Sequence, residues 1–366
     1  MINFENILLI DGAMGTSIQN LNLSSSDFGG DHLDGCNEYL NIINPTYIKD
    51  IHRSFIDVGA NIIETNTFGA TPIVLDEYKL SDLAEEINFK AAKIAKSSIN
   101  DSDNSILVAG SMGPTTKLLS LNQIKSSDIT FDLLVDNYRI QARGLISGGS
   151  DFLLIETSQD ILNVKAAIKG ISLAKSDLNR NDIPFAVQCT IENMGTTLGG
   201  QDIESFYLTI KHNDLLWIGM NCATGPKFMR EHLRILSQIS SHPISIVPNA
   251  GLPDEHGNYN ESPSGISVVN IQEDEEMVTA TFRNIPNLAV ESTQFVEQNG
   301  DMDNVPNPGE THGITIDFYN PSSNMIYDLE MVIVTADPNI ILLNNESILK
   351  KSLLCKKPSI PESIST

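Results

Sequence analysis

Residues 130–158, TFDLLVDNYRIQARGLISGGSDFLLIETS, contain one structural unit from which the fold of this chain can be predicted. In residues 130–147, apolar side chains recur at three- and four-residue spacing, which predicts an amphipathic helix. Residues 152–156 are a short apolar run that predicts a buried strand, and polar residues follow at Glu156 and Thr157. A helix that leads into a buried strand is typical of parallel α/β folds.

The same alternation of strand and helix extends over residues 1 to about 262. Segments such as residues 47–58, 80–97 and 227–239 have the spacing of amphipathic helices. Seven short apolar runs predict strands, at residues 7–10, 61–64, 106–110, 152–156, 185–190, 217–221 and 244–248. This pattern predicts an α/β fold, specifically a TIM-type (β/α)8 barrel that lacks its last β/α unit.

Polar and glycine-rich motifs follow six of these apolar runs. They are DGAMGT, ETNTFGA, GSMGPT, ETS, NCATGP and PNAGLP, in chain order. A single motif of this kind has an alternative interpretation as turn chemistry. Because active sites of parallel α/β folds form at the carboxyl ends of the strands, six motifs at that end indicate a functional site.

Composition and charge narrow the classes of partner and compartment. The formal net charge of −24 disfavours nucleic acid and anionic membranes as partners. No apolar run is long enough to cross a bilayer, and the first residues lack the basic region and cleavage site of a signal peptide. The four cysteines are widely spaced, which suits a reducing compartment. We therefore expect a cytoplasmic protein with no nucleic-acid partner and no membrane partner.

Seven motifs occur in a distinctive order: DGAMGT (11–16), GCNEYLN (35–41), ETNTFGA (64–70), GSMGPT (110–115), IET (155–157), GMNCATGP (219–226) and PNAGLP (248–253). In this order they resemble the homocysteine S-methyltransferase family, and most closely the N-terminal homocysteine-binding module of cobalamin-dependent methionine synthase. The resemblance covers residues 1 to about 262. It implies transfer of a methyl group to homocysteine, whose sulfur binds Zn²⁺ and is deprotonated by it at neutral pH.

The resemblance implies how the amino-acid end of homocysteine is bound. A loop of small residues approaches the substrate carboxylate through its backbone N–H groups, and Asp11 helps to fix this loop. Glu156, at the end of a strand, binds the substrate ammonium. The loop consists of Gly12, Ala13, Met14 and Gly15.

Further roles follow from the same resemblance. Glu64 and Asn66 line the floor of the pocket, and Asn221 orients either the cysteine that follows it or the substrate. Cys222 matches the first zinc ligand of the family, so it is the expected metal-binding and catalytic residue. Cys36 lies in a motif that the family uses for shape and is not assigned to metal.

Structural alternatives exist for these residues. Asp11 is alternatively a turn or cap residue, Glu64 a buried carboxylate tied to backbone amides, and Glu156 a surface charge at a strand end. An isolated cysteine in an apolar strand is usually a small buried hydrophobe. That interpretation suits Cys189 better than Cys222, because the motif NCATGP surrounds Cys222.

The sequence departs from the family at the remaining zinc ligands. The family supplies two of them from an adjacent cysteine pair in a GGCCGT motif, and this sequence contains no Cys-Cys pair. A catalytic zinc needs three protein ligands, and one thiolate is not enough. Recruitment of Cys189 or Cys355 is an alternative. We therefore expect an incomplete zinc site in this chain.

After about residue 262 the sequence changes from helical patterns to β-rich runs, which are MVTATFRNI, GITIDFYN, LEMVIVTA and NIILLNN. This part resembles the Ig-like β-sandwich repeats of secreted bacterial proteins. The expected organisation is a barrel at residues 1–262, an Ig-like β-rich domain at 263–348 and a flexible tail at 349–366. A recombined or misassembled reading frame is one hypothesis for the change, and sequencing across codons 255–275 tests it.

Two functional hypotheses follow. The first is a homocysteine S-methyltransferase module, which needs homocysteine and an external methyl donor. Methylcobalamin, S-methylmethionine and betaine are the donors that the family uses, and separate cobalamin or folate modules are possible partners. The second is a catalytically inactive fusion, or a binding or adhesion protein, whose β-rich domain carries the function.

Overall fold

A computed structural model of the 366-residue chain describes residues 7–100, 106–122 and 129–250, and the backbone of seven further strands between residues 278 and 365. The chain divides into two compact units, Met1–Asn260 and Glu261–Thr366. Each unit is described by itself.

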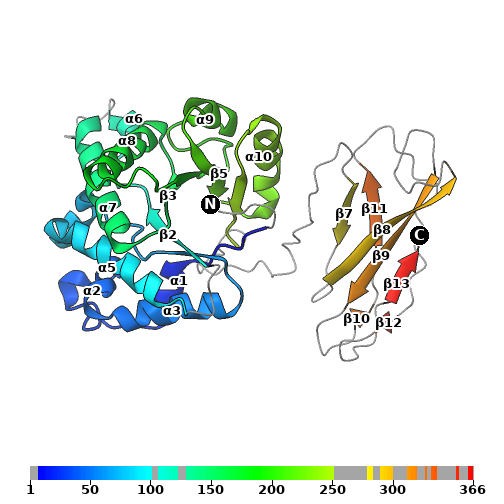
Figure 1. Cartoon of the computed structure of the whole chain (residues 1–366), viewed down its shortest axis with the longest axis horizontal. Coiled ribbons are helices and arrows are strands. Elements are labelled where there is room, and N and C mark those ends of the chain that lie inside the picture. Colours follow the sequence, from blue (N-terminus) through cyan, green and yellow to red (C-terminus); the bar gives the residue numbers. More distant parts are fainter. Residues whose placement is uncertain are drawn as a thin grey trace. The chain divides into compact units, whose positions relative to one another are not determined.

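The first unit is built on a curled sheet of six parallel strands in chain order (Figure 1). Each strand pairs in parallel with the next, which is the arrangement that strand–helix alternation predicts. The strands are β1 (Ile62–Glu64), β2 (Leu107–Met112), β3 (Phe152–Ser158), β4 (Phe185–Cys189), β5 (Leu215–Asn221) and β6 (Ile244–Val247). The prediction of an incomplete (β/α) barrel is confirmed.

Helices cover the outer side of this sheet (Figure 1). Three of the longer ones begin at an N-cap side chain that accepts a hydrogen bond from the first turn: Thr130 for α7, Asp160 for α8 and Asp202 for α9. The helices are α1 (Met14–Gln19), α2 (Leu40–Ile43), α3 (Pro45–Asp57), α4 (Pro72–Leu75), α5 (Ala84–Ser97), α6 (Leu119–Asn122), α7 (Phe131–Gly148), α8 (Ile161–Asp177), α9 (Ile203–Ile210) and α10 (Pro226–Ile239), with short 3-10 turns η1 (Asp31–Leu33), η2 (Asn37–Tyr39), η3 (Asp76–Tyr78) and η4 (Ser81–Leu83). The four helices predicted from spacing correspond to α3, α5, α7 and α10.

The first predicted strand, residues 7–10, is wrong as a strand. Ile10 forms an isolated parallel bridge with Ile62, and Leu9 O accepts hydrogen bonds from the N–H groups of both Asn61 and Ile62. This run lies at an edge of the sheet, and β1 is its one neighbour among the described residues. The apolar run therefore pairs with the sheet at Ile10 alone, and the chain leaves the sheet after Asp11.

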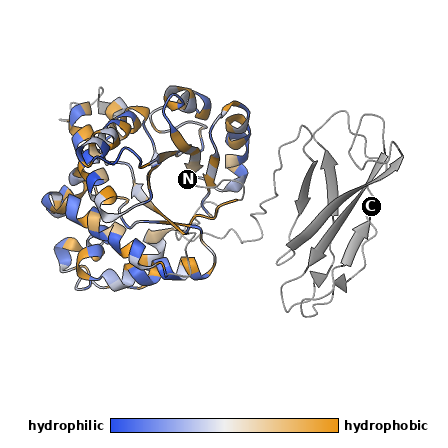
Figure 2. Cartoon of the chain, in the orientation of Figure 1, coloured by the Kyte–Doolittle hydropathy of each residue, from blue (hydrophilic) through white to orange (hydrophobic). Residues whose placement is uncertain are grey.

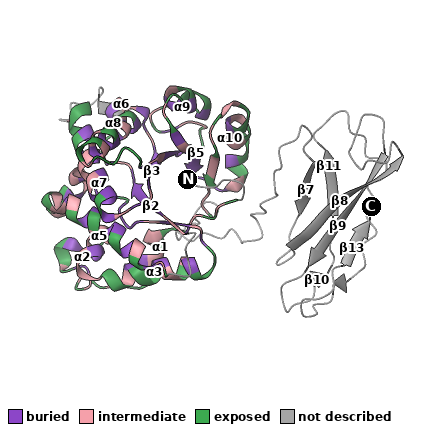
Figure 3. Ribbon diagram, viewed as in Figure 1, coloured by how far each residue is buried: buried purple, intermediate pink, exposed green. Residues whose placement is uncertain are grey.

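The core has two layers, one on each face of the sheet. Alternate strand residues of the inner face form one cluster of side chains, from Ile62, Ala109, Phe152, Leu154, Ala186 and Trp217. The rings of Phe152 and Trp217 pack edge to face, with their centroids 4.9 Å apart. The other face, which includes Leu153, Ile155 and Val187, packs against the apolar sides of the helices. Figures 2 and 3 show the apolar, buried strands and the helices with one polar, exposed side.

Glycines allow α5, α7 and α8 to pack closely. A Cβ at Gly144 would lie 2.4 Å from Glu85 O, and one at Gly148 would lie 2.5 Å from Phe89 O. A Cβ at Gly170 would lie 2.8 Å from Val135 O. Since these contacts are to backbone atoms, which cannot move aside, glycine is required for this helix spacing.

His52, on α3, provides a test of how burial affects acid stability. Its side chain is fully buried, and neither ring nitrogen has a hydrogen-bond partner among the described residues. Burial lowers its pKa from 6.5 to about 4. Between these two values the unfolded chain binds a proton that the folded chain does not, so His52 should make the protein less stable as the pH falls, by up to about 3 kcal/mol.

We expect the variant His52→Leu to lose this contribution. The free energy of unfolding, from urea titrations at pH 7, 6, 5 and 4, should fall less steeply with pH in the variant than in the native protein. Parallel curves for the two proteins would contradict the assignment.

The second unit is described as backbone strands. They pair antiparallel: β8 with β9, β9 with β13, β7 with β11 and β10 with β12. Their bounds are β7 (Val278–Phe282), β8 (Ala289–Asn299), β9 (Thr311–Tyr319), β10 (Ile326–Tyr327), β11 (Met331–Thr335), β12 (Ser352–Leu353) and β13 (Glu362–Ser365). Strand β13 lies within residues 349–366, the segment expected to be a flexible tail. The run NIILLNN and Cys355 lie outside the described residues.

Within the described part of the chain, no helix combines the length and the apolar character needed to span a bilayer.

Candidate functional site

Three carboxylates lie on the carboxyl-end side of the parallel sheet. Asp11 follows the bridge residue Ile10, Glu64 ends β1, and Glu156 lies near the end of β3. They are close enough that the charge of Glu156 raises the pKa of both Asp11 and Glu64. The sequence predicted each of these residues as part of a site, and the structure brings them together.

Asp11 is held by one carboxylate oxygen. Its Oδ2 accepts a hydrogen bond from Glu64 N at 3.1 Å, and Asp11 N donates to Ile62 O at 2.9 Å. The other oxygen, Oδ1, is buried without a partner among the described residues, although the residue is 7 % exposed. A buried carboxylate oxygen without a donor is unfavourable. Asp11 is therefore fixed in place with one oxygen available to a ligand.

Glu156 is held through both carboxylate oxygens. Ser111 Oγ donates a short hydrogen bond to Oε1, at 2.5 Å. Asn221 Nδ2 donates to Oε2 at 3.2 Å, and the Thr157 hydroxyl lies 3.4 Å from the same oxygen. The carboxylate is thus oriented by side chains from β2, β3 and β5. The alternative of a surface charge at a strand end is wrong for Glu156, because it is buried.

Burial is the main cause that raises the pKa of all three carboxyl groups. Neighbouring carboxylates add to the shift at Asp11 and Glu64. The hydrogen bonds to Glu156 act in the opposite direction and favour its charged form. The region around Asp11, Glu64 and Glu156, here called the mouth of the barrel, therefore favours binding of either a proton or a positively charged ligand group.

Cys222 lies in a strained turn directly after β5. Thr157, Cys222 and Ala223 have positive φ values of 52°, 60° and 54°. These values are uncommon for residues other than glycine and are typical of functional sites. Backbone hydrogen bonds hold the turn, from Cys222 N to Val247 O at 3.1 Å and from Thr224 N to Cys222 O at 2.6 Å.

Asn221 connects this turn to Glu156. Its Oδ1 accepts from Thr157 N at 2.8 Å, and its Nδ2 donates to Thr157 Oγ1 at 2.8 Å. The same Nδ2 lies 3.5 Å from Cys222 Sγ, and Thr157 Oγ1 lies 3.8 Å from that sulfur. Burial raises the pKa of the Cys222 thiol to about 11, and the Thr157 hydrogen bond opposes the shift. Asn221 therefore contacts Cys222, Thr157 and Glu156 at once.

Asn66 is placed differently from the other predicted site residues. Its Nδ2 donates to Asn37 O at 2.7 Å, and its own carbonyl accepts from Asn41 Nδ2 at 2.7 Å. Glu38 Oε1 accepts from Gly69 N in the same region. The motif GCNEYLN thus holds the ETNTFGA loop, and the Asn66 side chain is used in that contact.

The predicted loop of small residues is partly helical. Gly12 and Ala13 are extended chain, whereas Met14 and Gly15 begin helix α1. A Cβ at Gly12 would lie 2.9 Å from the Phe55 ring, so a side chain there would require the ring to shift. A Cβ at Gly15 would lie 3.9 Å from its nearest neighbour, Asn37, so packing does not require a glycine there.

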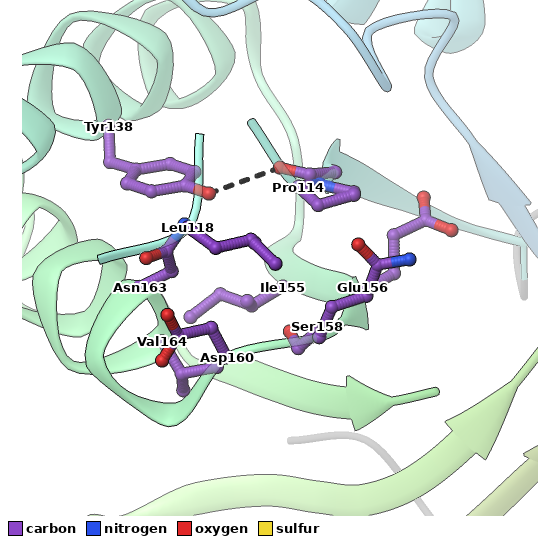
Figure 4. A pocket seen from close by; sticks show the side chains of 11 residues that line it. Pro114, Leu118, Tyr138, Ile155, Glu156, Ser158, Asp160, Asn163 and Val164 are labelled. Atoms are coloured by element: carbon purple, nitrogen blue, oxygen red, sulfur yellow. Dashed lines mark hydrogen bonds between the residues drawn. The ribbon is translucent and has the colours of Figure 1, made fainter. Parts of the chain in front are cut away.

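A small cavity lies beside Glu156, between the β2 end and the start of α8 (Figure 4). Its volume is about 10 Å³, which is room for a single water molecule. The Tyr138 hydroxyl donates to Gly113 O at 3.3 Å along its wall. This cavity is too small for an amino acid.

The described residues do not fit a three-ligand metal site. Within residues 7–100, 106–120 and 129–250, no group of three His, Cys, Asp or Glu side chains is arranged to hold a metal ion. Cys36 and Cys189 are fully buried in separate apolar clusters. For Cys189 this agrees with the interpretation as a small hydrophobe. Cys222 is the one partly exposed thiol of the three that the structure describes.

Two residues of this site, Ser111 and Thr157, were not predicted from the sequence. Ser111 donates to Glu156, and Thr157 contacts Glu156, Asn221 and Cys222. Both belong to motifs that the sequence singled out, GSMGPT and IET, but neither was given a role. Their position directly at strand ends, beside the chosen residues, was the available signal.

A model of the family described as "Homocysteine S-methyltransferase" matches residues 8–282. Two curated proteins named "Methionine synthase", from Mycobacterium leprae and Mycobacterium tuberculosis, are each 39% identical to this chain over 252 residues. The match covers 68% of this chain and 20% of each relative, so the chain corresponds to about one fifth of their length.

Solved structures show the same fold. The homocysteine methyltransferase MmuM from Escherichia coli superposes in its metallated form with a TM-score of 0.55, at 19% identity, over 68% of this chain and 85% of that one. Its oxidized form gives a TM-score of 0.54 at 19% identity, over 66% and 82%.

Proposed function

Because this chain belongs to the homocysteine S-methyltransferase family, we propose that its barrel binds homocysteine as the methyl acceptor of methionine synthesis. The proposal concerns residues 8 to about 250, where the motifs lie. Since the chain matches one fifth of the length of its curated relatives, the whole reaction is proposed to need further modules or proteins. A cytoplasmic location is part of the proposal.

The oxygen Oδ1 of Asp11, which has no hydrogen-bond partner among the described residues, is the observation that carries the proposal. Oδ1 of Asp11 is buried beside Glu64 and Glu156, in a group of carboxylates with raised pKa values. A primary ammonium group supplies three N–H donors and a positive charge, which satisfy this oxygen and reduce the repulsion. The α-ammonium of an amino acid is such a group.

The other binding roles are proposed from position. The backbone of Gly12 and Ala13, and the first turn of α1 with Met14 and Gly15, is proposed to face the substrate carboxylate. Asn66 is proposed to act indirectly, by holding the loop that follows Glu64. Asn221 and Thr157 orient Cys222 on the side of the mouth where the substrate sulfur is expected.

The zinc that the family implies does not fit the residues described here. Zinc in a catalytic site needs three protein ligands, and Cys222 has neutral hydrogen-bonding neighbours, the Thr157 hydroxyl and the Asn221 amide. We therefore derive no chemical step through a metal. What this chain's residues do is bind the amino-acid end and position one thiol.

The methyl donor is proposed to come from outside this chain. Methylcobalamin, S-methylmethionine and betaine are the three candidates from the family. The likeness to methionine synthase favours methylcobalamin delivered by a separate cobalamin module.

A calorimetric titration of the whole chain with L-homocysteine tests the proposal. We expect saturable binding of L-homocysteine and at least tenfold weaker binding of D-homocysteine, since the carboxylates fix the α-ammonium in one position. In the variant Glu64→Gln, which removes one charge near that position, affinity should fall by about tenfold.

The variant Asp50→Asn is the matched control, because it removes the same charge from an exposed position on α3. It should bind L-homocysteine as the native chain does. Absence of binding of either enantiomer to the native chain would refute the proposed function.

A further inference from the structure

We infer that this barrel recognises the α-amino end of its ligand and not the sulfur, so it accepts unbranched L-α-amino acids of homocysteine's length with little regard to the terminal group. This inference rests on the proposed function and narrows it. It concerns which amino acids the binding site of this chain accepts.

The amino end of the site is fully formed. Asp11 is locked by its hydrogen bond from Glu64 N, and its second oxygen is buried and free of partners in the described residues. Glu156 is locked by Ser111 and Asn221. Since these positions are fixed before a ligand arrives, binding an ammonium group requires no rearrangement of them.

The sulfur end of the site lacks comparable chemistry. Cys222 Sγ has the Asn221 amide at 3.5 Å and the Thr157 hydroxyl at 3.8 Å, and both belong to neutral side chains. The Glu156 carboxylate lies beside the same two side chains, with its Oε2 3.2 Å from Asn221 Nδ2 and 3.4 Å from Thr157 Oγ1. A negatively charged ligand sulfur is disfavoured in the same surroundings.

Within the described residues, no second exposed cysteine is available to complete a metal site with Cys222. Four cysteines are present, with no adjacent pair, and two of them are fully buried elsewhere in the barrel. That leaves Cys222 and Cys355 as the thiols available to a metal, and Cys355 lies outside the described residues. Three protein ligands are needed for a catalytic zinc.

Without a metal–sulfur bond, the terminal group of the ligand contributes through its apolar surface. A single buried methyl or methylene group changes affinity by about fourfold. Homocysteine, methionine and homoserine share the amino-acid end. Methionine adds one methyl group to the sulfur, and homoserine carries a hydroxyl group in place of the thiol. Their affinities should therefore be similar.

Calorimetry with the whole chain tests this, in a reducing buffer, with L-homocysteine, L-methionine and L-homoserine. Each ligand is titrated into metal-free protein and into protein supplied with one equivalent of Zn²⁺. We expect the three dissociation constants to agree within about fivefold, and zinc to change that of homocysteine by about twofold or less. Metal analysis after dialysis should find well under one zinc per chain.

Two variants separate the ends of the site. Asp11→Asn should weaken all three ligands by the same factor, because they share the ammonium. Cys222→Ala should leave the ratio of the three affinities unchanged.

The outcomes distinguish the two proposals. If homocysteine binds at least tenfold more tightly than the other two once zinc is added, and Cys222→Ala removes that preference, this inference is wrong and the proposed function stands. If none of the three amino acids binds, both are wrong.

Discussion

Replacing Asp11 by Asn is expected to lower the affinity for L-homocysteine by about a hundredfold and to make the free protein more stable. The affinity falls because the buried acceptor Oδ1 loses its charge, and removing one partner of a buried ion pair costs about 3 kcal/mol. The stability rises because the new amide group still accepts from Glu64 N and supplies N–H donors beside Glu64 and Glu156. Relief of one unsatisfied buried acceptor contributes about 1–2 kcal/mol.

The gain in stability at Asp11→Asn should depend on pH. Folding raises the pKa of the native Asp11 carboxyl group. Its contribution to stability is therefore fully present below the pKa that it has in the unfolded chain, and this contribution is lost as the pH rises towards the raised pKa. The Asn side chain of the variant does not ionise, so the variant does not lose stability in this way as the pH rises. Urea unfolding at pH 5 and at pH 8 should therefore show the larger difference between variant and native protein at pH 8. A variant less stable than the native protein at both values would count against the assigned role.

The second large effect is expected at Asn221. Changing it to Asp removes the Nδ2 donor that serves Glu156, Thr157 and Cys222, and places a carboxylate where the amide lay 3.2 Å from Glu156 Oε2. An uncompensated buried charge destabilises a protein by about 3–5 kcal/mol. Asn221→Asp should therefore unfold at much lower urea concentration at neutral pH and lose homocysteine binding.

The pH dependence of Asn221→Asp separates charge from shape. Protonation of the new carboxyl group restores a donor and removes the repulsion, so stability should recover in part as the pH falls. The control Asn181→Asp makes the same change at an exposed position and should alter stability by about 0.5 kcal/mol or less. Equal losses at pH 5 and pH 8 would show that the carboxylate charge is not the cause.

Much of the fold was predictable because each element has a local signature. The apolar run at 152–156 and the helical spacing at 130–147 correspond to β3 and α7 almost residue for residue. The run at residues 7–10 failed because a strand forms only where a neighbouring strand pairs along its length, which local sequence does not report. Ile10 has such a neighbour in Ile62, and pairing goes no further.

The candidate site was predictable at the level of which strand ends meet. Hydrogen bonds join residues that are far apart in the sequence: Asp11 and Glu64 are 53 residues apart, and Glu156 and Asn221 are 65 residues apart. Parallel strands bring such residues together, because their carboxyl ends lie on the same side of the sheet. The hydrogen-bond partners were not predictable. Whether the Asn66 side chain faces the carboxylates or Asn37 depends on the path of a loop. The left-handed backbone conformation of Thr157 cannot be predicted from its residue type.

The left-handed turn residues at Thr157, Cys222 and Ala223 have a consequence for laboratory evolution. Each of these conformations is unfavourable for a residue with a side chain, and each persists because its surroundings leave no alternative. Variants chosen for heat resistance alone would gain by exchanging such residues for glycine or asparagine, which tolerate the conformation. A library screened in that way should accumulate substitutions at these three residues and at Lys79, which has a similar φ of 58°. Those at the three turn residues would map the part of the chain that is shaped for a ligand.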